Sequence, residues 1–266
     1  MEKRLTSQDI IKMKARGERV AALTAYDYSM AQAIDRAGVD MILVGDSLGM
    51  VIYGEDNTLR VTMDQMISHG AAVVKGSHRA FVTVDMPFMS FQVSVEDGIR
   101  NAGRLMSATG ASAVKFEGSH LELARRLVEC GIPVVGHLGY TPQSVKAFGK
   151  EIVRGRAMDE RERILEGALK LEKAGITALV LESVPESLGK QVSSELHIPV
   201  IGIGSGRFCD GEIQVCYDIM GIYPNFVPKH TRIFSQVGRS VTRSVKKYVL
   251  AVKEKTFPGE ENVLRS

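Results

Sequence analysis

Short apolar runs alternate with segments of helical character along the whole chain. Each run holds about four or five residues, most of them aliphatic or β-branched, as expected of parallel strands buried on both faces. Eight such runs are present, the last of them the least regular: 20–24, 41–44, 81–85, 113–117, 133–137, 178–182, 199–202 and 213–217. Eight is the number of strands that closes a parallel barrel.

The stretches between these runs carry the signals that begin and end helices. Glycines stand where a helix would end in a left-handed residue before the next strand, namely at Gly38, Gly131 and Gly175. Polar residues precede an acid or amide by three positions, as in or close to a capping box, in four pairs: Thr62 and Gln65, Ser94 and Asp97, Ser119 and Glu122, and Asp159 and Glu162. This alternation predicts an α/β fold of the (βα)8 TIM-barrel type.

The chain is long enough for one such barrel. It has 266 residues, and α/β barrels commonly run to about 250 as a single domain. No repeat, low-complexity segment or linker divides it, and its last helical segment, 236–255, carries valines on one side and many Lys and Arg residues elsewhere. We therefore expect residues 1–266 to form a single (βα)8-barrel domain with a C-terminal helical extension.

Charge and cysteine content narrow the class of protein. A net charge of +3, without a basic run interleaved with aromatics, argues against a nucleic-acid partner. No stretch approaches the roughly 18 apolar residues of a membrane span, and the charged N-terminal segment is unlike a secretory signal. The three cysteines show no zinc-ligand spacing, and their odd number suits a reducing compartment. The sequence predicts a cytoplasmic protein with no membrane or nucleic-acid partner.

Acidic residues close two of the apolar runs. Asp46 follows the strand in LVGDSLG, and Asp85 ends the strand in VTVDMPF. Reactive groups of a (βα)8 barrel lie at the carboxyl ends of its strands, so the two carboxylates should meet at one rim. They would repel each other unless one is protonated or a cation lies between them, and oxygen ligands favour Mg2+ over zinc. The alternative is that each Asp only caps the loop or helix that follows.

Four further ionisable residues are expected at the same rim. Lys115 and Glu117 share one face of their strand. The lysine could bind the carboxylate of an oxo acid, and the glutamate could support a metal. The alternative is that they form a salt bridge with each other or with neighbouring residues. Glu182 ends the strand in VLES and could act as a general base, with a pKa raised by a partly dry site, or could cap the next helix. His137 either hydrogen-bonds the substrate or only satisfies the backbone.

Two loops at this rim invite a functional interpretation. The glycine-rich IGIGSG, which ends at Gly206, could let backbone N–H groups approach an anion or could serve only a tight turn. The segment 139–158 contains Pro142, Gly149, Gly155 and several basic residues. We expect part of this segment to cover the rim and limit the access of water, although an ordinary surface or subunit contact would explain it equally well.

In their order along the chain, these motifs resemble those of the ketopantoate hydroxymethyltransferase family. The resemblance runs from about Thr6 to the terminal GEEN, through TAYDYSMA, DMILVGDSLGM, DMPFMSF, VKFEG, GHLGYTPQS, LVLESVP and PVIGIGSG. It implies a (βα)8 barrel that assembles into a homo-oligomer, usually a homodecamer. Small molecules, a 2-oxo acid and a folate, would be its other partners.

The resemblance also assigns roles to residues at the rim. Mg2+ would be held by Asp46 and Asp85, with Glu117 at or beside the metal, and Glu182 would be the catalytic proton acceptor. Residues that bind or border the oxo acid would be Asp46, Ser47, Asp85, Lys115 and His137.

The implied reaction forms 2-dehydropantoate, in pantothenate biosynthesis, from 3-methyl-2-oxobutanoate and the one-carbon donor 5,10-methylenetetrahydrofolate. Mg2+ would polarise the carbonyl so that Glu182 can remove the C3 proton, and the enolate would attack the methylene carbon. The residues by themselves reach only a metal-assisted enolisation. An Mg2+-dependent aldolase or lyase acting on another 2-oxo acid, a Schiff-base enzyme using Lys115, and a noncatalytic ligand-binding or scaffolding barrel remain as alternatives.

The sequence departs from the family pattern at three places. Where the family reads close to GHDTTLPVT, this chain reads GEDNTLRVT, with Glu55 in place of His and Arg60 in place of Pro. The usual DGQ becomes DGE at Glu212, and the usual PKF becomes PNF at Asn225. We expect these changes to leave the metal and base residues intact and to affect folate contacts, loop closure or subunit packing.

Overall fold

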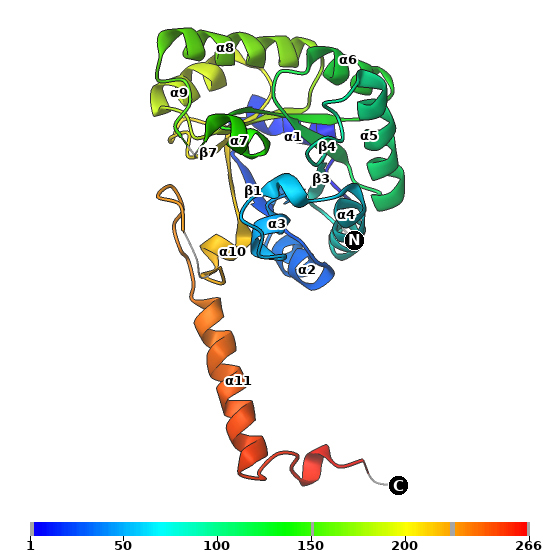
Figure 1. The fold of residues 1–266 in the computed structure, drawn as a ribbon, viewed down its shortest axis with the longest axis vertical. Helices are drawn as coiled ribbons and strands as arrows, with labels where there is room; N and C mark the ends of the chain where they lie inside the picture. The colour runs from blue at the N-terminus through cyan, green and yellow to red at the C-terminus, as the bar shows by residue number, and fades with distance from the viewer. Residues whose placement is uncertain (1–2, 150–151, 224–226, 265–266) are drawn as a thin grey trace. The chain divides into compact units, whose positions relative to one another are not determined.

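Eight parallel strands close into one barrel in the computed structural model, which describes residues 3–149, 152–223 and 227–264 (Figure 1). Each strand pairs with the next along the chain, and the eighth returns to pair with the first. The strands are β1 Val20–Thr24, β2 Met41–Val44, β3 Phe81–Asp85, β4 Ala113–Glu117, β5 Val134–Gly139, β6 Ala178–Glu182, β7 Val200–Ile203 and β8 Gly211–Gln214. This topology confirms the predicted (βα)8 TIM barrel.

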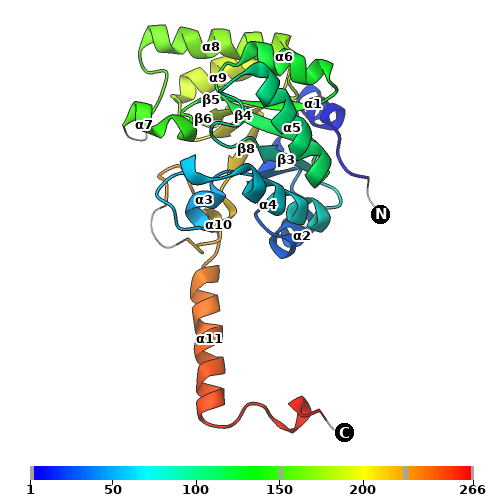
Figure 2. The same cartoon turned by 45° about the vertical axis from the view of Figure 1, so that its right-hand side comes forward.

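The chain divides into two compact units, Met1–Val215 and Cys216–Ser266. In the first unit, helices α4, α5, α6 and α8 lie outside the strands in both views (Figures 1 and 2). The helices of this unit are α1 Ser7–Ala15, α2 Tyr28–Arg36, α3 Leu48–Val51, α4 Met63–Gly76, α5 Val95–Thr109, α6 Leu121–Glu129, α7 Val145–Phe148, α8 Met158–Lys173 and α9 Glu186–Glu195, with short 3-10 turns η1 Thr58–Arg60 and η2 Pro142–Ser144.

The second unit contains the predicted C-terminal helix. Its elements are α10 Cys216–Ile219, α11 Val237–Lys253 and the 3-10 turn η3 Glu260–Asn262. Apolar side chains recur along α11 at helical spacing and are exposed within the described residues: Val241, Val245, Tyr248 and Val252. Among the helices described in either unit, none combines the length and the apolar character that a membrane crossing requires.

All eight predicted strands are present, five of them residue for residue, but the predicted bounds of the eighth strand are wrong. β8 runs over Gly211–Gln214 instead of 213–217, and Cys216 already begins α10. Its limits follow from its pairing with β1, in which Val20 lies opposite Gly211 and Leu23 opposite Gln214. That pairing joins residues about 190 positions apart in the sequence, so the local apolar pattern could not reveal it.

Two of the four predicted helix starts are confirmed. Thr62 and Gln65 form a capping box at the start of α4, and the Ser94 hydroxyl accepts a hydrogen bond from the N–H of Asp97 at the start of α5. The predicted left-handed glycines are also confirmed, with positive φ angles at Gly38, Gly131 and Gly175.

At the other two predicted starts a helix does begin, but the predicted cap residues are wrong. His120, not Ser119, precedes α6, and the Ser119 hydroxyl instead lies against Gly167 of α8. Asp159 is not an N-cap, because α8 begins one residue earlier and places this acid in its first turn. An acid in the first turn stabilises a helix through the helix dipole, and a three-residue spacing cannot distinguish it from a cap.

An apolar core fills the barrel and leaves its carboxyl end for polar residues. Inward-facing residues from all eight strands form one buried cluster: Val20, Ala22, Met41, Leu43, Phe81, Ala113, Val135, Ala178, Val180, Ile201 and Ile213. Ile10 and Met13 of α1 belong to the same cluster, together with the first residues of several strands. Helix α1 therefore closes the amino end of the barrel, and the opposite end remains for a site.

Candidate active site

Five neighbouring strands bring ionisable side chains to the carboxyl end of the barrel. The register places Asp85 beside Lys115, and Glu117 beside His137. The ionisable residues at this rim, from β2 to β6 in order, are Asp46, Asp85, Lys115, Glu117, His137 and Glu182. All but Glu182 are buried, and the side chain of Glu182 is 15% exposed. The structure thus brings together the predicted site residues in one mostly buried group, the acid-base cluster.

Lys115 and Asp85 form the ion pair at the centre of this cluster. Lys115 Nζ lies 2.6 Å from Asp85 Oδ1, and both side chains are 5% exposed. The other oxygen of Asp85 accepts a hydrogen bond from the N–H of Asp46, at 3.0 Å. Burial alone would lower the pKa of Lys115, but the charges of Asp85, Glu117 and Asp46 together raise it. An ammonium held in this way is a poor Schiff-base nucleophile, which needs a neutral amine.

Asp46 and Glu117 are carboxyl groups that resist ionisation. Burial, and next the negative charge of Asp85, raise the pKa of Asp46 to about 7. Burial, and next the charge of Asp46, raise the pKa of Glu117 well above its usual value. Both shifts have the direction expected where several carboxyl groups share one cation, here Lys115. The cluster therefore holds more acidic groups than its own lysine can neutralise.

Gln143 joins these acids, and the interpretation of the sequence did not single it out. Its side-chain amide donates hydrogen bonds to Asp46 Oδ2 and to the carbonyl of Met86, each at 2.9 Å. Its backbone N–H donates to Glu117 Oε2, also at 2.9 Å. Gln143 belongs to η2, which follows β5, and it stands in the GHLGYTPQS motif. Only its place in that motif could have pointed to it.

His137 and Glu182 lie side by side at the next two strand ends. His137 Nε2 is 3.2 Å from Glu182 Oε2, and His137 Nδ1 is 3.8 Å from Glu117 Oε1. Burial, and next the charge of Lys115, lower the pKa of His137 well below its usual value. The imidazole is therefore neutral at pH 7, with its two ring nitrogens nearest to the carboxyl groups of Glu182 and Glu117.

Ser47 reaches the rim beside a buried tyrosine. Its hydroxyl lies 2.9 Å from the hydroxyl of Tyr26, a residue that follows β1 and is fully buried. Gly45 precedes both Asp46 and Ser47, and a Cβ at Gly45 would lie only 2.8 Å from Ser47 Oγ. The glycine in LVGDSLG therefore makes room for the serine. Tyr26 is a second residue of the site that the strand-end pattern missed, since it lies past the end of its strand.

The acids of the cluster do not converge on one point. Within residues 3–149, 152–223 and 227–264, no three His, Cys, Asp or Glu side chains are arranged to hold a metal ion between them. Asp85 instead faces Lys115, while Asp46 and Glu117 each accept a hydrogen bond from Gln143. A cation bound here would therefore need further ligands that these side chains do not supply.

The glycine-rich loop after β7 serves packing. Gly206 has a φ of +86°, and a Cβ there would lie within 2.8 Å of three atoms of Glu186. The N–H of Arg207 already donates to a carboxylate of the same protein, Glu186 Oε1, at 3.1 Å. Of the two alternatives for IGIGSG, the tight turn is the one that the structure supports.

Two residues that depart from the family pattern contact each other. Arg60 Nη1 donates to Glu55 Oε2 at 3.0 Å, across the loop that follows α3. Glu212, which stands where the family usually has Gln, also has a local partner: Gln214 Nε2 donates a hydrogen bond to Glu212 Oε1 at 2.8 Å. Asn225 lies outside the described residues. The Glu55 and Arg60 replacements therefore form a pair, and their effect on folate contacts stays a prediction.

The segment 139–158 reaches the cluster through its first part. Within this segment, Gln143 contacts Asp46 and Glu117. Farther along, the backbone N–H of Arg154 donates a hydrogen bond to the carbonyl of Ser183, the residue after Glu182. Residues 150–151 lie outside the described residues. Closure of the segment over a substrate stays a prediction.

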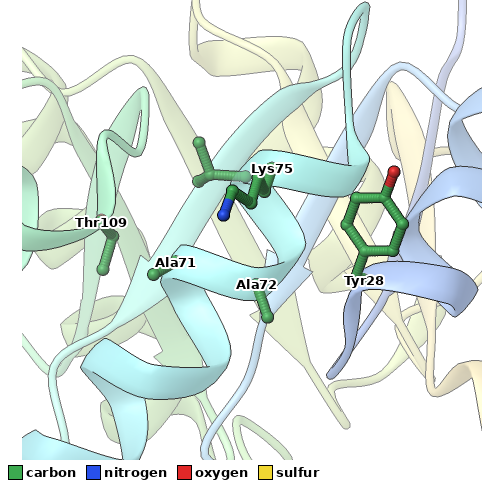
Figure 3. A pocket seen from close by; sticks show the side chains of 6 residues that line it. Tyr28, Ala71, Ala72, Lys75 and Thr109 are labelled. Carbon is green, nitrogen blue, oxygen red and sulfur yellow. The ribbon is translucent and has the colours of Figure 1, made fainter.

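A surface hollow of about 470 Å³ lies among the outer helices (Figure 3). It is lined by residues of α2, α4 and α5: Tyr28, Ala71, Ala72, Val74, Lys75 and Thr109. None of these belongs to the acid-base cluster.

Comparison with known proteins matches almost the whole chain. A family model described as ketopantoate hydroxymethyltransferase matches residues 4–260. The chain is 47% identical over 264 residues to the 3-methyl-2-oxobutanoate hydroxymethyltransferase of Acetivibrio thermocellus, covering 98% of this chain and 93% of that protein. It is 46% identical over 262 residues to the protein of that name from Syntrophus aciditrophicus, covering 98% and 96%.

Solved structures of distant proteins share the fold. A phosphonopyruvate hydrolase has a TM-score of 0.61 at 11% identity and covers 98% of this chain and 92% of its own. A 2,3-dimethylmalate lyase has a TM-score of 0.60 at 13% identity and covers 97% and 92%. At this level of identity the likeness shows the barrel alone.

Proposed function

The chain belongs to the ketopantoate hydroxymethyltransferase family, which confirms the enzyme class expected from the sequence, and we propose that it forms 2-dehydropantoate. The substrates would be 3-methyl-2-oxobutanoate and 5,10-methylenetetrahydrofolate, in pantothenate biosynthesis. The observation that carries this proposal is that the acids and the lysine of the family motifs lie together in one buried cluster at the barrel mouth.

The chemistry of the cluster fits Mg2+. The raised pKa values of Asp46 and Glu117 indicate an excess of acidic groups, which a divalent cation would balance. Mg2+ is usually held by one or two carboxylates together with water and substrate oxygens, so it does not require three converging side chains. Asp46 and Asp85 would hold the ion, with Glu117 beside it. When bound, Mg2+ would polarise the 2-oxo group and make the C3 proton more acidic.

Residues around the ion pair would bind the oxo acid. Lys115 presents an ammonium that suits the substrate carboxylate, while Asp46 and Asp85 would border the same end of the substrate. Ser47, held beside Tyr26, has a hydroxyl that can donate or accept a hydrogen bond. The neutral imidazole of His137 has one N–H, which can donate to a substrate oxygen.

Glu182 would accept the proton from C3. The C3–H bond breaks, the proton passes to the Glu182 carboxylate, and the electron pair forms the C2–C3 double bond while the carbonyl π pair moves to the oxygen of the enolate. C3 would then bond to the methylene carbon as the C2 carbonyl forms again. The two bonds from that carbon to the folate nitrogens break, water supplies the hydroxyl oxygen, and the proton on Glu182 and one proton of the water pass to the two nitrogens, which releases tetrahydrofolate. His137, 3.2 Å from Glu182, is neutral and therefore does not weaken the base as a nearby cation would.

The test follows loss of the C3 proton signal of 3-methyl-2-oxobutanoate by NMR in D2O, without folate. We expect exchange by the parent chain with Mg2+, and loss of exchange both without Mg2+ and in Glu182→Gln. Glu195→Gln, an exposed replacement at the end of α9, is the matched control and should exchange normally. Normal exchange by Glu182→Gln would contradict the base assignment, and no exchange by the parent would contradict the proposed function.

The same proposal includes a cytoplasmic homo-oligomer, a homodecamer by family resemblance. It is supported by the free thiols of Cys130, Cys209 and Cys216, which suit a reducing compartment. It is also supported by the exposed apolar side chains along α11, which are typical of a surface that another chain covers. Sedimentation of the full chain would measure the assembly.

A further inference from the structure

The side-chain amide of Gln143 is held in one orientation by three hydrogen bonds. Both hydrogens of its amide are used, one by Asp46 and one by the Met86 carbonyl. Its amide oxygen accepts a hydrogen bond from Gln92 Nε2, at 3.0 Å. A flipped amide would turn its oxygen toward two other acceptors, the carboxylate of Asp46 and the carbonyl of Met86. The contacts therefore fix which end of the amide faces Asp46.

The contacts of Gln143 tie together four strand ends. Asp46 follows β2, Met86 follows β3, Glu117 ends β4, and Gln143 itself follows β5. The residue is only 6% exposed, so its hydrogen bonds form where water cannot easily replace them. A rotation of the Asp46 carboxylate would break one of them, and a movement of the Glu117 carboxylate would break another. Gln143 thus restricts two acids of the same cluster as the Lys115–Asp85 pair.

We propose that Gln143 is a positioning residue, which aligns Asp46 and Glu117 for a divalent cation from the loop after β5. The inference rests on the proposed function, because it takes Asp46 as a ligand of that cation. Gln143 would act through these carboxylates and not on the substrate. Residues that orient metal ligands by hydrogen bonds typically contribute about 10–100-fold to metal affinity or activity.

The test replaces Gln143 with methionine, which has nearly the same length but no hydrogen-bond donor. The replacement keeps the hydrogen bond from the backbone N–H of residue 143 to Glu117, so it tests the contribution of the side-chain amide alone. The control is Gln32→Met, the same replacement on the outer helix α2. Two quantities are measured for each chain: the Kd of Mg2+ by titration calorimetry without oxo acid, and the kcat and KM of C3 proton exchange. Thermal unfolding monitors the fold.

We expect Gln143→Met to weaken Mg2+ binding by about 10–100-fold and to lower kcat for exchange even with saturating Mg2+ and oxo acid. Gln32→Met should leave both quantities unchanged. A purely structural role would lower the unfolding temperature and leave the Kd and kcat of the folded protein intact. That result overturns the proposal.

A second variant covers the case in which Gln143→Met does not fold. Gln143→Asn keeps the amide but is one methylene shorter, so it cannot reach both Asp46 and Met86. Losses of Mg2+ affinity and kcat in this variant support the proposal, and parent-like values overturn it. A parent chain that neither binds Mg2+ nor exchanges the proton overturns the proposed function and this inference together. A parent that does both, with variants equal to it, overturns only the role of Gln143.

Discussion

Replacing Asp46 with asparagine should make the protein more stable while it removes a proposed metal ligand. Asparagine has the shape of a protonated aspartic acid, and its amide oxygen can still accept the hydrogen bond from Gln143. It cannot ionise, so it avoids the cost of a buried negative charge beside Asp85. A gain in stability at an active-site position is expected where function requires an unfavourable charge.

The size of the effect follows from the pKa of Asp46, which is raised from 3.8 to about 7. Between these pH values the folded chain retains a proton that the unfolded chain has lost. The free energy of unfolding of the parent therefore falls as the pH rises through this window. Three pKa units correspond to about 4 kcal/mol, so Asp46→Asn should gain up to about 4 kcal/mol at pH 8. At pH 5, where folded Asp46 is protonated, the gain should be only about 2 kcal/mol.

Urea unfolding at pH 5 and pH 8, with a chelator and at one fixed chain concentration, measures the difference. Asp56→Asn is the matched control, because it removes the same charge from an exposed loop and should change stability by less than about 0.5 kcal/mol. An Asp46→Asn chain no more stable than the parent at pH 8 would refute the reasoning. So would a gain of equal size at both pH values, since that gain would not come from ionisation.

Three further experiments test other charged residues. Lys115→Met should lower the free energy of unfolding at pH 8 by about 3–5 kcal/mol, because it leaves Asp85 buried without its cation; unchanged stability in urea would contradict the ion pair. Borohydride with the substrate and a chelator should leave Lys115 unmodified by mass spectrometry, and a trapped adduct would restore the Schiff-base alternative. A double-mutant cycle of Glu55→Ala and Arg60→Ala should give a coupling of about 0.2–1 kcal/mol, since the Arg60 side chain is 79% exposed; no measurable coupling would mean that the two replacements are independent.

Most of the barrel could be predicted because its strands are locally encoded. Strands β1 to β4 and β6 are mostly apolar runs, and β2, β3 and β4 are buried at every residue, so such runs are visible without knowledge of their partners. β8 lacks this property, because its Glu212 and Gln214 are only partly buried and its limits depend on β1. The same contrast explains the helix starts, since a capping box is a local device and the contact of Ser119 with α8 is not.

The residues at the strand ends could be read from the apolar pattern, which predicts that Asp46, Asp85, Lys115, Glu117 and Glu182 belong to one rim. How these residues meet depends on the folded barrel: Lys115 pairs with Asp85, burial and crowding raise the pKa of Asp46, and Gln143 joins the acids. Strand position follows from local apolar patterns, whereas charge pairing, desolvation and a hydrogen bond between residues 97 positions apart exist only after the barrel has closed.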